Sequence, residues 1–304
     1  MSRGLNGRRR IWGVGLVGVL FIVLCAVSVY AVRWYHGFYH HVTHEELTHA
    51  VKHSTFPATI RSSTVELHLY QQEHAANQPL VLFSSGDGGW SPFCADVAAH
   101  MAATGVTVVG VDVKTYLVKF ASPQKPISAE DLTSDYDTIA HIARAQPGVD
   151  SNAPVVLAGW SLGASYSVIV ATQPEFDVAV SRIVAISLPL YGERAWKPTD
   201  SIIYFTHGTP SEKLFEAHQY LKKLKQTPIV FLNASDDDTS PLREAQSLYA
   251  SVPGAKHLYT VKASGHHFEG GEQEFYHDLD QGLSLPQIAD KDDNKLKESG
   301  SAPS

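Results

Sequence analysis

The sequence predicts an α/β fold in which a mostly parallel central sheet is covered by helices on both faces. From Thr64 onward, short runs rich in Val and Ile alternate with longer amphipathic stretches. The run VTVVGVDV at residues 106–113 is apolar on both faces, which is typical of a strand buried inside a parallel sheet. Repeated alternation of strands and helices favours parallel strands joined by helical crossovers.

The same patterns place the individual elements. Strands are expected at residues 64–70, 79–85, 106–113, 154–159, 182–189, 228–234 and 257–263. Helices are expected around residues 96–103, from Ser128 to about Ala145, from Leu162 onward, and around residues 213–225. The second of these begins with Ser128-Ala-Glu-Asp131, which fits a capping box at a helix start.

An apolar segment near the N-terminus predicts a membrane anchor. Residues 11–32 carry no charge, and about 20 such residues span a bilayer as a helix. The run is longer than the apolar region of a signal peptide, so we expect an uncleaved anchor. Four arginines precede it, whereas only Arg33 follows closely, which places the N-terminus in the cytoplasm. We therefore expect a single-pass protein of the bacterial inner membrane whose folded domain lies in the periplasm.

The chain divides by composition into five expected segments: a basic cytoplasmic segment (1–10), the transmembrane anchor (11–32), a His-rich juxtamembrane linker (33–60), the α/β domain (64–285) and a disordered tail (286–304). Within the linker, histidines at i,i+4 spacing would share a helix face. We interpret the segment as a solvated linker and expect no metal site, although metal binding by these histidines stays open.

Composition and charge exclude several classes of function. The formal net charge is -7, so an overall basic surface for phosphate backbones is absent and nucleic acid is not expected as a partner. The two cysteines, Cys25 and Cys94, are too few for a disulfide framework, and a cysteine-ligated zinc site is not expected.

The motif Gly159-Trp160-Ser161-Leu162-Gly163 is the strongest indication of chemistry. It follows an expected strand and precedes an expected helix. In the α/β-hydrolase fold, G-x-S-x-G in this position forms a sharp turn that exposes the serine hydroxyl as a nucleophile. The pattern is short enough to occur by chance, so the strand-turn-helix context carries the prediction of Ser161 as the nucleophile.

A serine nucleophile needs a base and an acid, which follow it along this fold in the order Ser, Asp or Glu, His. Three consecutive aspartates follow the strand at residues 228–234, and we predict Asp237 as the acid, with Asp236 and Asp238 as alternatives. Two histidines follow the last strand, and we predict His266 as the base, with His267 contacting it or the substrate. An acidic turn and a packed surface histidine are the structural alternatives.

The attacked carbonyl also needs an oxyanion hole built from main-chain N–H groups. One donor in this fold is the residue after the nucleophile, here Leu162, and the other comes from the loop after an early strand. That loop is glycine-rich and reads SSGDGGW at residues 84–90, where Asp87 is the expected donor and Gly88 the alternative. Neither a Rossmann fingerprint nor a P-loop lysine accompanies these glycines, so a nucleotide site is not expected.

Four stretches together resemble the VirJ/AcvB family of bacterial virulence proteins: FSSGDGGW (83–90), VVGVD (108–112), GWSLG (159–163) and GHHF (265–268). The resemblance covers about residues 64–285. It implies a periplasmic serine hydrolase with Ser161, Asp237 and His266 as its triad. Some members of the family hydrolyse the lysyl ester of aminoacylated phosphatidylglycerol, and some are linked to type IV secretion and virulence.

These observations lead to one principal hypothesis and two alternatives. The principal one is a membrane-anchored serine hydrolase that cleaves an ester, with the aminoacyl ester of lysyl-phosphatidylglycerol as the candidate substrate. An acidic mouth would suit a cationic head group and is expected from Asp87, Asp236, Asp238 and Glu269. The alternatives are a carboxylesterase for soluble acyl esters and a non-catalytic binding protein for an envelope or secretion partner. The proposed chemistry requires no cofactor.

Overall fold

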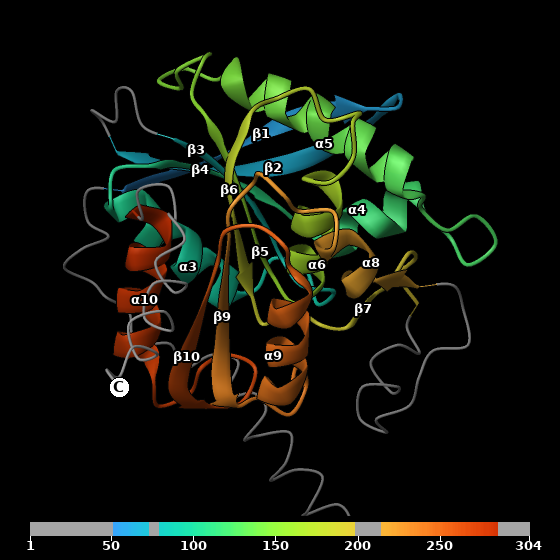
Figure 1. The fold of residues 1–304 in the computed structure, drawn as a ribbon. Coiled ribbons are helices and arrows are strands. Elements are labelled where there is room, and N and C mark those ends of the chain that lie inside the picture. Colours follow the sequence, from blue (N-terminus) through green and yellow to red (C-terminus); the bar gives the residue numbers. More distant parts are fainter. Residues whose placement is uncertain (1–50, 73–78, 198–213, 285–304) are drawn as a thin grey trace, which may run out of the picture. The chain divides into compact units, whose positions relative to one another are not determined.

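The central sheet contains eight strands. They are β1 (Val51–Ile60), β2 (Ser63–Gln72), β3 (Leu80–Ser84), β4 (Thr107–Val111), β5 (Val155–Trp160), β6 (Val180–Ile186), β9 (Ile229–Asp236) and β10 (Lys256–Ser264). Their order across the sheet is β1-β2-β4-β3-β5-β6-β9-β10 (Figure 1). The structure is a computed structural model that describes residues 51–72, 79–197 and 214–284.

Helices cover both faces of this sheet (Figure 1). They are α3 (Pro92–Ala103), α4 (Val113–Phe120), α5 (Ala129–Arg144), α6 (Leu162–Val170), α8 (Ala217–Leu221), α9 (Leu242–Ser251) and α10 (Glu272–Ser284). A separate pair of two-residue strands, β7 (Tyr191–Gly192) and β8 (Phe215–Glu216), lies beyond the end of β6. The prediction of a mostly parallel sheet between two helical layers is confirmed.

In the order of the sheet, the six strands β4, β3, β5, β6, β9 and β10 pair in parallel. Strands β1 and β2 are antiparallel to their neighbours. Side chains alternate between the two faces along each strand. Val81 and Phe83 of β3 therefore pack in the cluster under α3 and α10, while Leu80 and Leu82 pack in the cluster under α5 and α6. Both clusters consist of buried apolar side chains, and they hold the sheet between the two sets of helices.

The His-rich linker was expected to extend to residue 60, and this boundary is wrong. Residues 51–60 form β1, which pairs along its whole length with β2. Phe56, Ala58 and Ile60 alternate inward and are buried, and this period of two belongs to an edge strand with one solvated face. The two-residue turn between the strands places Arg61 and Ser62 at positive φ, as type I′ hairpin turns require. Residues 33–50 lie outside the described residues.

Most of the other expected elements are present with shifted ends. The capping interaction at the start of α5 is confirmed, because the Ser128 side chain accepts the N–H of Asp131 at 3.0 Å. Helix α3 begins four residues earlier than expected because Ser91 caps it and Pro92 occupies its first position. The helix expected around residues 213–225 is the short α8. Helices α4 and α10 were not predicted from the sequence.

The membrane anchor predicted at residues 11–32 and the disordered tail predicted at residues 286–304 both lie outside the described residues. Among the helices of residues 51–72, 79–197 and 214–284, none combines the length and apolar character needed to cross a bilayer.

Trp90 attaches the glycine-rich loop after β3 to the face of the sheet. Its ring stacks on His68 of β2 at 4.4 Å between centroids and meets Phe83 edge-on at 5.8 Å. It lies directly over Gly110 of β4, where a Cβ would come within 2.1 Å of the Trp90 ring. The absence of a side chain at Gly110 therefore creates the space that the Trp90 indole fills.

The substitution Gly110→Ala should destabilise the fold. Its methyl group would overlap the Trp90 ring, so either the loop or the strand must shift, at a cost of about 2 to 3 kcal/mol. Urea unfolding measures the difference. A matched control is Gly88→Ala, since a Cβ at Gly88 meets nothing within 4 Å and should change the free energy of unfolding by less than about 0.5 kcal/mol. Equal effects of the two substitutions would contradict this account of Trp90 packing.

Candidate active site

Ser161 occupies a strained turn between β5 and α6. Its φ of 55° and ψ of -122° lie outside the regions that non-glycine residues ordinarily adopt. Its N–H donates to the carbonyl oxygen of Ile186 at the end of β6, at 2.9 Å. The residue is 8% exposed. This is the strand-turn-helix geometry that the sequence motif predicted.

Two glycines make this turn sterically feasible. A Cβ at Gly159 would lie 2.2 Å from the main chain of Gly163, and a Cβ at Gly163 would lie 2.1 Å from the carbonyl oxygen of Ser84. Both distances are far shorter than any real carbon contact, so a side chain at either position would force the main chain apart. The spacing of the two glycines around Ser161 thus has a direct physical reason.

Asp237 lies in the loop after β9 and is the buried member of the three consecutive aspartates. Its Oδ1 accepts the N–H groups of Thr239 and Ser240, both at 2.9 Å. Asn233 of β9 stabilises the loop that carries Asp237, because its side-chain amide donates to the Ser240 carbonyl at 3.0 Å. The Ser240 hydroxyl also donates to the carbonyl of Ser187 at 3.1 Å.

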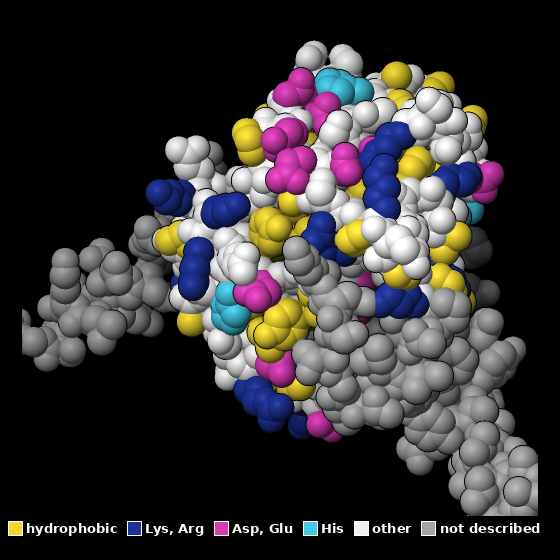
Figure 2. All heavy atoms as spheres, turned by 90° about the vertical axis from the view of Figure 1, so that its right-hand side faces the viewer, with side chains coloured by type: hydrophobic (Ala, Val, Ile, Leu, Met, Phe, Trp, Pro, Cys, Tyr) yellow, Lys and Arg dark blue, Asp and Glu magenta, His cyan; other side chains and the backbone are white. Residues whose placement is uncertain are grey.

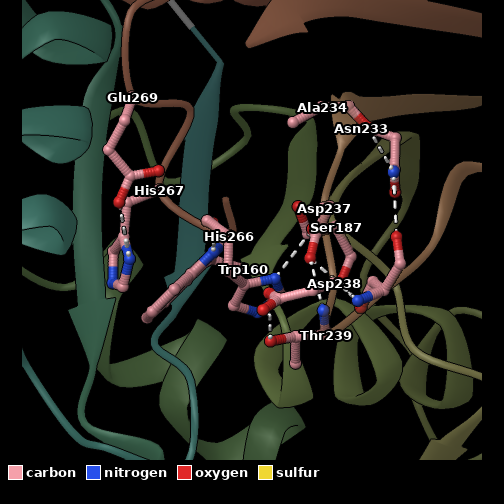
Figure 3. A network of polar contacts seen from close by, with 11 residues as sticks. Trp160, Ser187, Asn233, Ala234, Asp237, Asp238, Thr239, His266, His267 and Glu269 are labelled. Atoms are coloured by element: carbon pink, nitrogen blue, oxygen red, sulfur yellow. Dashed lines mark hydrogen bonds and ion pairs between the residues drawn. The ribbon is translucent and has the colours of Figure 1, made fainter. Parts of the chain in front are cut away.

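His266 contacts Asp237 directly. The two side chains meet through His266 Nδ1 and Asp237 Oδ2 at 2.8 Å, with the carboxylate fully buried and 12% of the imidazole side chain exposed (Figure 3). Asp236 and Asp238 are exposed. The structure therefore pairs the histidine with Asp237, which the sequence could only favour among three candidates.

The histidine loop after β10 is a closed turn. Ser264 and Glu269 exchange two main-chain hydrogen bonds at 2.9 and 3.0 Å. Gly265 (φ 69°) and Phe268 (φ 63°) are both left-handed. The N–H of Gly265 donates to the carbonyl of Asp236 at 2.8 Å, which joins this loop to the loop of the acid.

The surroundings of Asp237 stabilise its charged form. Burial alone would raise the pKa of this carboxyl, but the adjacent His266 and the N–H groups of Ser240 and Thr239 together hold its pKa below the ordinary value. An ionised carboxylate only accepts hydrogen bonds, so the proton of the neutral imidazole lies on Nδ1. Nε2 of His266 is then the basic nitrogen, and it is buried with no hydrogen-bond partner among the described residues.

Leu162, which follows Ser161 in the chain, and Asp87 are the two expected oxyanion donors, and both line one narrow surface pocket. The described residues that line it are Asp87, Leu117, Leu162, Glu193, Ala195 and Trp196. Gly88, the alternative donor, is exposed and is not part of this lining.

The acidic character of the site differs from the expectation. Of the four acidic residues predicted at the mouth, only Asp87 lines the pocket. Glu269 lies under Gly265, and its carboxylate is 3.7 Å from the ring of His267. Burial raises the pKa of this carboxyl.

Glu193 is the acidic residue of the pocket that the sequence reasoning missed. It lies in the segment after β7, is 6% exposed and lines the same pocket as Leu162 and Asp87. Its carbonyl oxygen accepts the hydroxyl of Tyr166 at 2.9 Å. Burial raises the pKa of Tyr166, and the charges of Glu193 and Asp87 raise it further. No local pattern marks Glu193, because its position depends on how the segment after β7 folds back over α6.

One group of possible metal ligands occurs among the described residues. Asp137, His141 and Asp177 bring their ligand atoms within 4.8 Å of one another. They belong to α5 and to the segment between α6 and β6, and none contributes to the pocket that Leu162 and Asp87 line. The face that carries α5 is seen in Figure 2, where acidic and histidine side chains gather near its upper edge. His141 already contacts both carboxylates, at 3.1 and 3.5 Å, so contacts within the protein account for the arrangement.

A family model for the bacterial virulence protein VirJ matches residues 78–279, which is more than half of the chain. The chain belongs to the VirJ family. The resemblance seen in the four sequence stretches is thereby confirmed. No curated protein matches the chain significantly in sequence.

Solved structures similar to this VirJ-family chain include two dienelactone hydrolases and Est1E. A Klebsiella pneumoniae protein assigned as a dienelactone hydrolase has a TM-score of 0.60 at 12% identity, over 78% of this chain and 100% of its own. The dienelactone hydrolase of Anabaena variabilis has a TM-score of 0.54 at 16% identity, over 77% and 98%. Est1E of Butyrivibrio proteoclasticus has a TM-score of 0.54 at 12% identity, over 75% and 96%. These likenesses show the α/β-hydrolase fold.

Acid should remove the stability that the Asp237 carboxylate contributes. Because its pKa is lower in the folded chain than in the unfolded chain, the contribution is fully present above the unfolded value of about 4 and disappears as the pH falls through the folded value. We expect Asp237→Asn to cost about 1 to 3 kcal/mol near neutral pH, and the difference from wild type to shrink toward about pH 2. Urea unfolding at a series of pH values measures it.

The exposed neighbour provides the control for this experiment. Asp238→Asn should change the free energy of unfolding by less than about 0.5 kcal/mol at each pH. A cost of Asp237→Asn that stays constant from neutral pH to acid would show that the charged form of Asp237 does not stabilise the fold.

Proposed function

We propose that this VirJ-family chain is a serine hydrolase that cleaves carboxylic esters. The observation that carries the proposal is the strained Ser161 turn, which lies on the same sheet edge as a buried aspartate-histidine pair joined at 2.8 Å. The strained Ser161 conformation costs free energy, which is typical of residues kept for function rather than for stability. The α/β-hydrolase fold places nucleophile, acid and base in this chain order.

The proposed chemistry proceeds in two balanced steps. As Ser161 Oγ bonds to the ester carbonyl carbon, its proton moves to His266 Nε2, and the carbonyl electron pair becomes an oxyanion held by the N–H groups of Leu162 and Asp87. When the oxyanion collapses, the alcohol leaves and takes the proton from His266. Water then repeats the sequence on the acyl-enzyme, which releases the carboxylic acid and restores Ser161.

His266 Nε2 and Ser161 Oγ share no hydrogen bond in this structure. The contact between nucleophile and base is often long or poorly aligned without substrate and shortens in the complex. The Nδ1 contact to Asp237 is already formed, so completing the proposed triad requires only the contact at the Nε2 side.

A fluorophosphonate probe tests whether Ser161 is activated. With the purified full-length chain in detergent, we expect labelling of the wild type and none in Ser161→Ala or His266→Ala. Asp237→Asn should label at least about 1000-fold more slowly, because the histidine loses its orientation. Asp238→Asn is the matched control and should label at the wild-type rate. A folded wild type that does not label would contradict the hydrolase and favour the binding-protein alternative.

For the substrate, we propose the aminoacyl ester of a phospholipid, with lysyl-phosphatidylglycerol as the preferred form. Support comes from the two carboxylate residues Asp87 and Glu193, which line the same pocket as Leu162, the residue after Ser161, since a lysyl ester brings a cationic ammonium group.

We further propose that residues 11–32 anchor the chain in the inner membrane with the hydrolase domain in the periplasm. Such an anchor would keep the pocket at the surface that carries the lipid.

Vesicles of phosphatidylglycerol containing either the lysyl or the alanyl ester test the substrate. We expect kcat/KM for lysine release to exceed that for alanine release by at least about 10-fold, which corresponds to one well-placed charge interaction. Glu193→Gln keeps the shape of the side chain and should bring the ratio below about 3-fold. Equal rates for both lipids and for soluble p-nitrophenyl acetate would favour a general carboxylesterase.

A protease tests the proposed topology: when it is added to spheroplasts, it should digest the hydrolase domain if that domain lies in the periplasm.

A further inference from the structure

Trp160 connects the nucleophile turn to the histidine loop. It immediately precedes Ser161 and is 6% exposed. Its indole N–H donates to the main-chain carbonyl of His266 at 3.1 Å (Figure 3). Its ring centroid lies 5.1 Å from that of His266 and 4.8 Å from that of His267. One side chain therefore contacts the loop of the base through both its polar edge and its ring.

The same indole also supports the loop of the expected oxyanion donor. At Gly86, a Cβ would lie 3.0 Å from Trp160 Cζ3 and 3.4 Å from Ser161 Cβ. The main chain of this loop thus approaches both the ring and the nucleophile as closely as a glycine permits. Trp160 consequently lies between the loop after β3 and the loop after β10, with Ser161 next to it in the chain.

The histidine loop depends on contacts from outside itself for its position. Its closing hydrogen bonds between Ser264 and Glu269 set its internal shape, and the Asp237 carboxylate holds the imidazole at Nδ1. The Gly265 N–H bond to Asp236 attaches the start of the loop, and the bond from Trp160 to the His266 carbonyl adds an attachment on the main chain of the histidine itself. With one point on the side chain and one on the main chain, the direction of Nε2 is determined.

We propose that Trp160 is a positioning residue for the proposed hydrolysis, whose indole sets the separation of His266 and of the Gly86 loop from Ser161. The inference rests on the proposed function and concerns the same site. Trp160 acts through His266 and the loop main chain, and it takes no part in bond making. A displacement of about 1 Å between a base and its nucleophile is enough to lower a rate about 100-fold.

Trp160→Phe should therefore lower kcat far more than it changes KM. The smaller ring lacks the N–H donor and leaves a gap on the side of the histidine loop. With the full-length chain in detergent and p-nitrophenyl acetate as the substrate, we expect kcat to fall about 10- to 100-fold and KM to stay within about 3-fold. The rate of fluorophosphonate labelling should fall by the same factor as kcat.

A matched control separates positioning from lost core packing. Leu279→Ala removes a fully buried side chain of α10 from the same core cluster that contains Trp160. It should lower the thermal midpoint at least as much as Trp160→Phe does, while kcat stays within about 3-fold of the wild type. If kcat falls in both variants in proportion to the lost stability, Trp160 has a structural role only and the inference is wrong.

A double-mutant cycle tests the contact with the Gly86 loop. Gly86→Ala alone should lower kcat, because its methyl group presses on the indole. In the Trp160→Phe background the smaller ring leaves room for that methyl group. The double variant should then be more active than the product of the two single effects predicts.

The outcomes distinguish this inference from the proposed function. A wild type that neither hydrolyses p-nitrophenyl acetate nor labels with the fluorophosphonate would overturn the proposed function, and this inference with it. An active wild type whose Trp160→Phe variant keeps kcat within about 3-fold, or a cycle whose effects simply multiply, would overturn the role of Trp160 alone.

Discussion

The close main-chain approach around Ser161 is the constraint on which the rest of the site depends. Gly159 and Gly163 nearly touch, and Gly163 in turn lies against the Ser84 carbonyl, so β3, β5 and α6 meet with no side chain between them. This contact forces Ser161 into a conformation that costs about 1 to 3 kcal/mol. The conformation persists because the neighbouring strands are fully buried and because Ile186 of β6 accepts the Ser161 N–H.

Parallel pairing of the strands then brings the proposed acid and base to the same edge of the sheet as Ser161. In the register of the sheet, Ser84 is opposite Gly159, Trp160 is opposite Ile186, and Asp236 is opposite Ser264. Each of these pairs marks the carboxyl end of a strand, and the loops that follow carry the nucleophile, the acid and the base. Residues separated by more than one hundred positions in the chain thus become neighbours through strand register, and the loops need only local hydrogen bonds to orient them.

The sequence predicted those features that depend on local pattern. Buried strands such as β4 are visible as continuous apolar runs, and Ser161 is visible because its turn demands glycines at two fixed positions. The edge strand β1 was missed because only its alternate residues are buried and its turn to β2 uses Arg61 and Ser62 in place of glycine. Glu193 was missed because its place in the pocket results from long-range folding. Among the three aspartates, only burial and the N–H groups of the loop single out Asp237.

The charges around Ser161 have opposing effects in the proposed reaction. Asp237 is buried, and its charge is compensated by His266 and by two N–H groups, so it stabilises the imidazolium that forms when the serine loses its proton. Asp87 and Glu193 line the same pocket as Leu162, and in the proposed reaction negative charges there disfavour the oxyanion. A cationic substrate neutralises them and removes this penalty, whereas a neutral substrate does not. Selectivity for a cationic ester would then arise in the rate of the chemical step as well as in binding, because the carboxylates that attract the ammonium group also oppose the reaction of substrates that lack it.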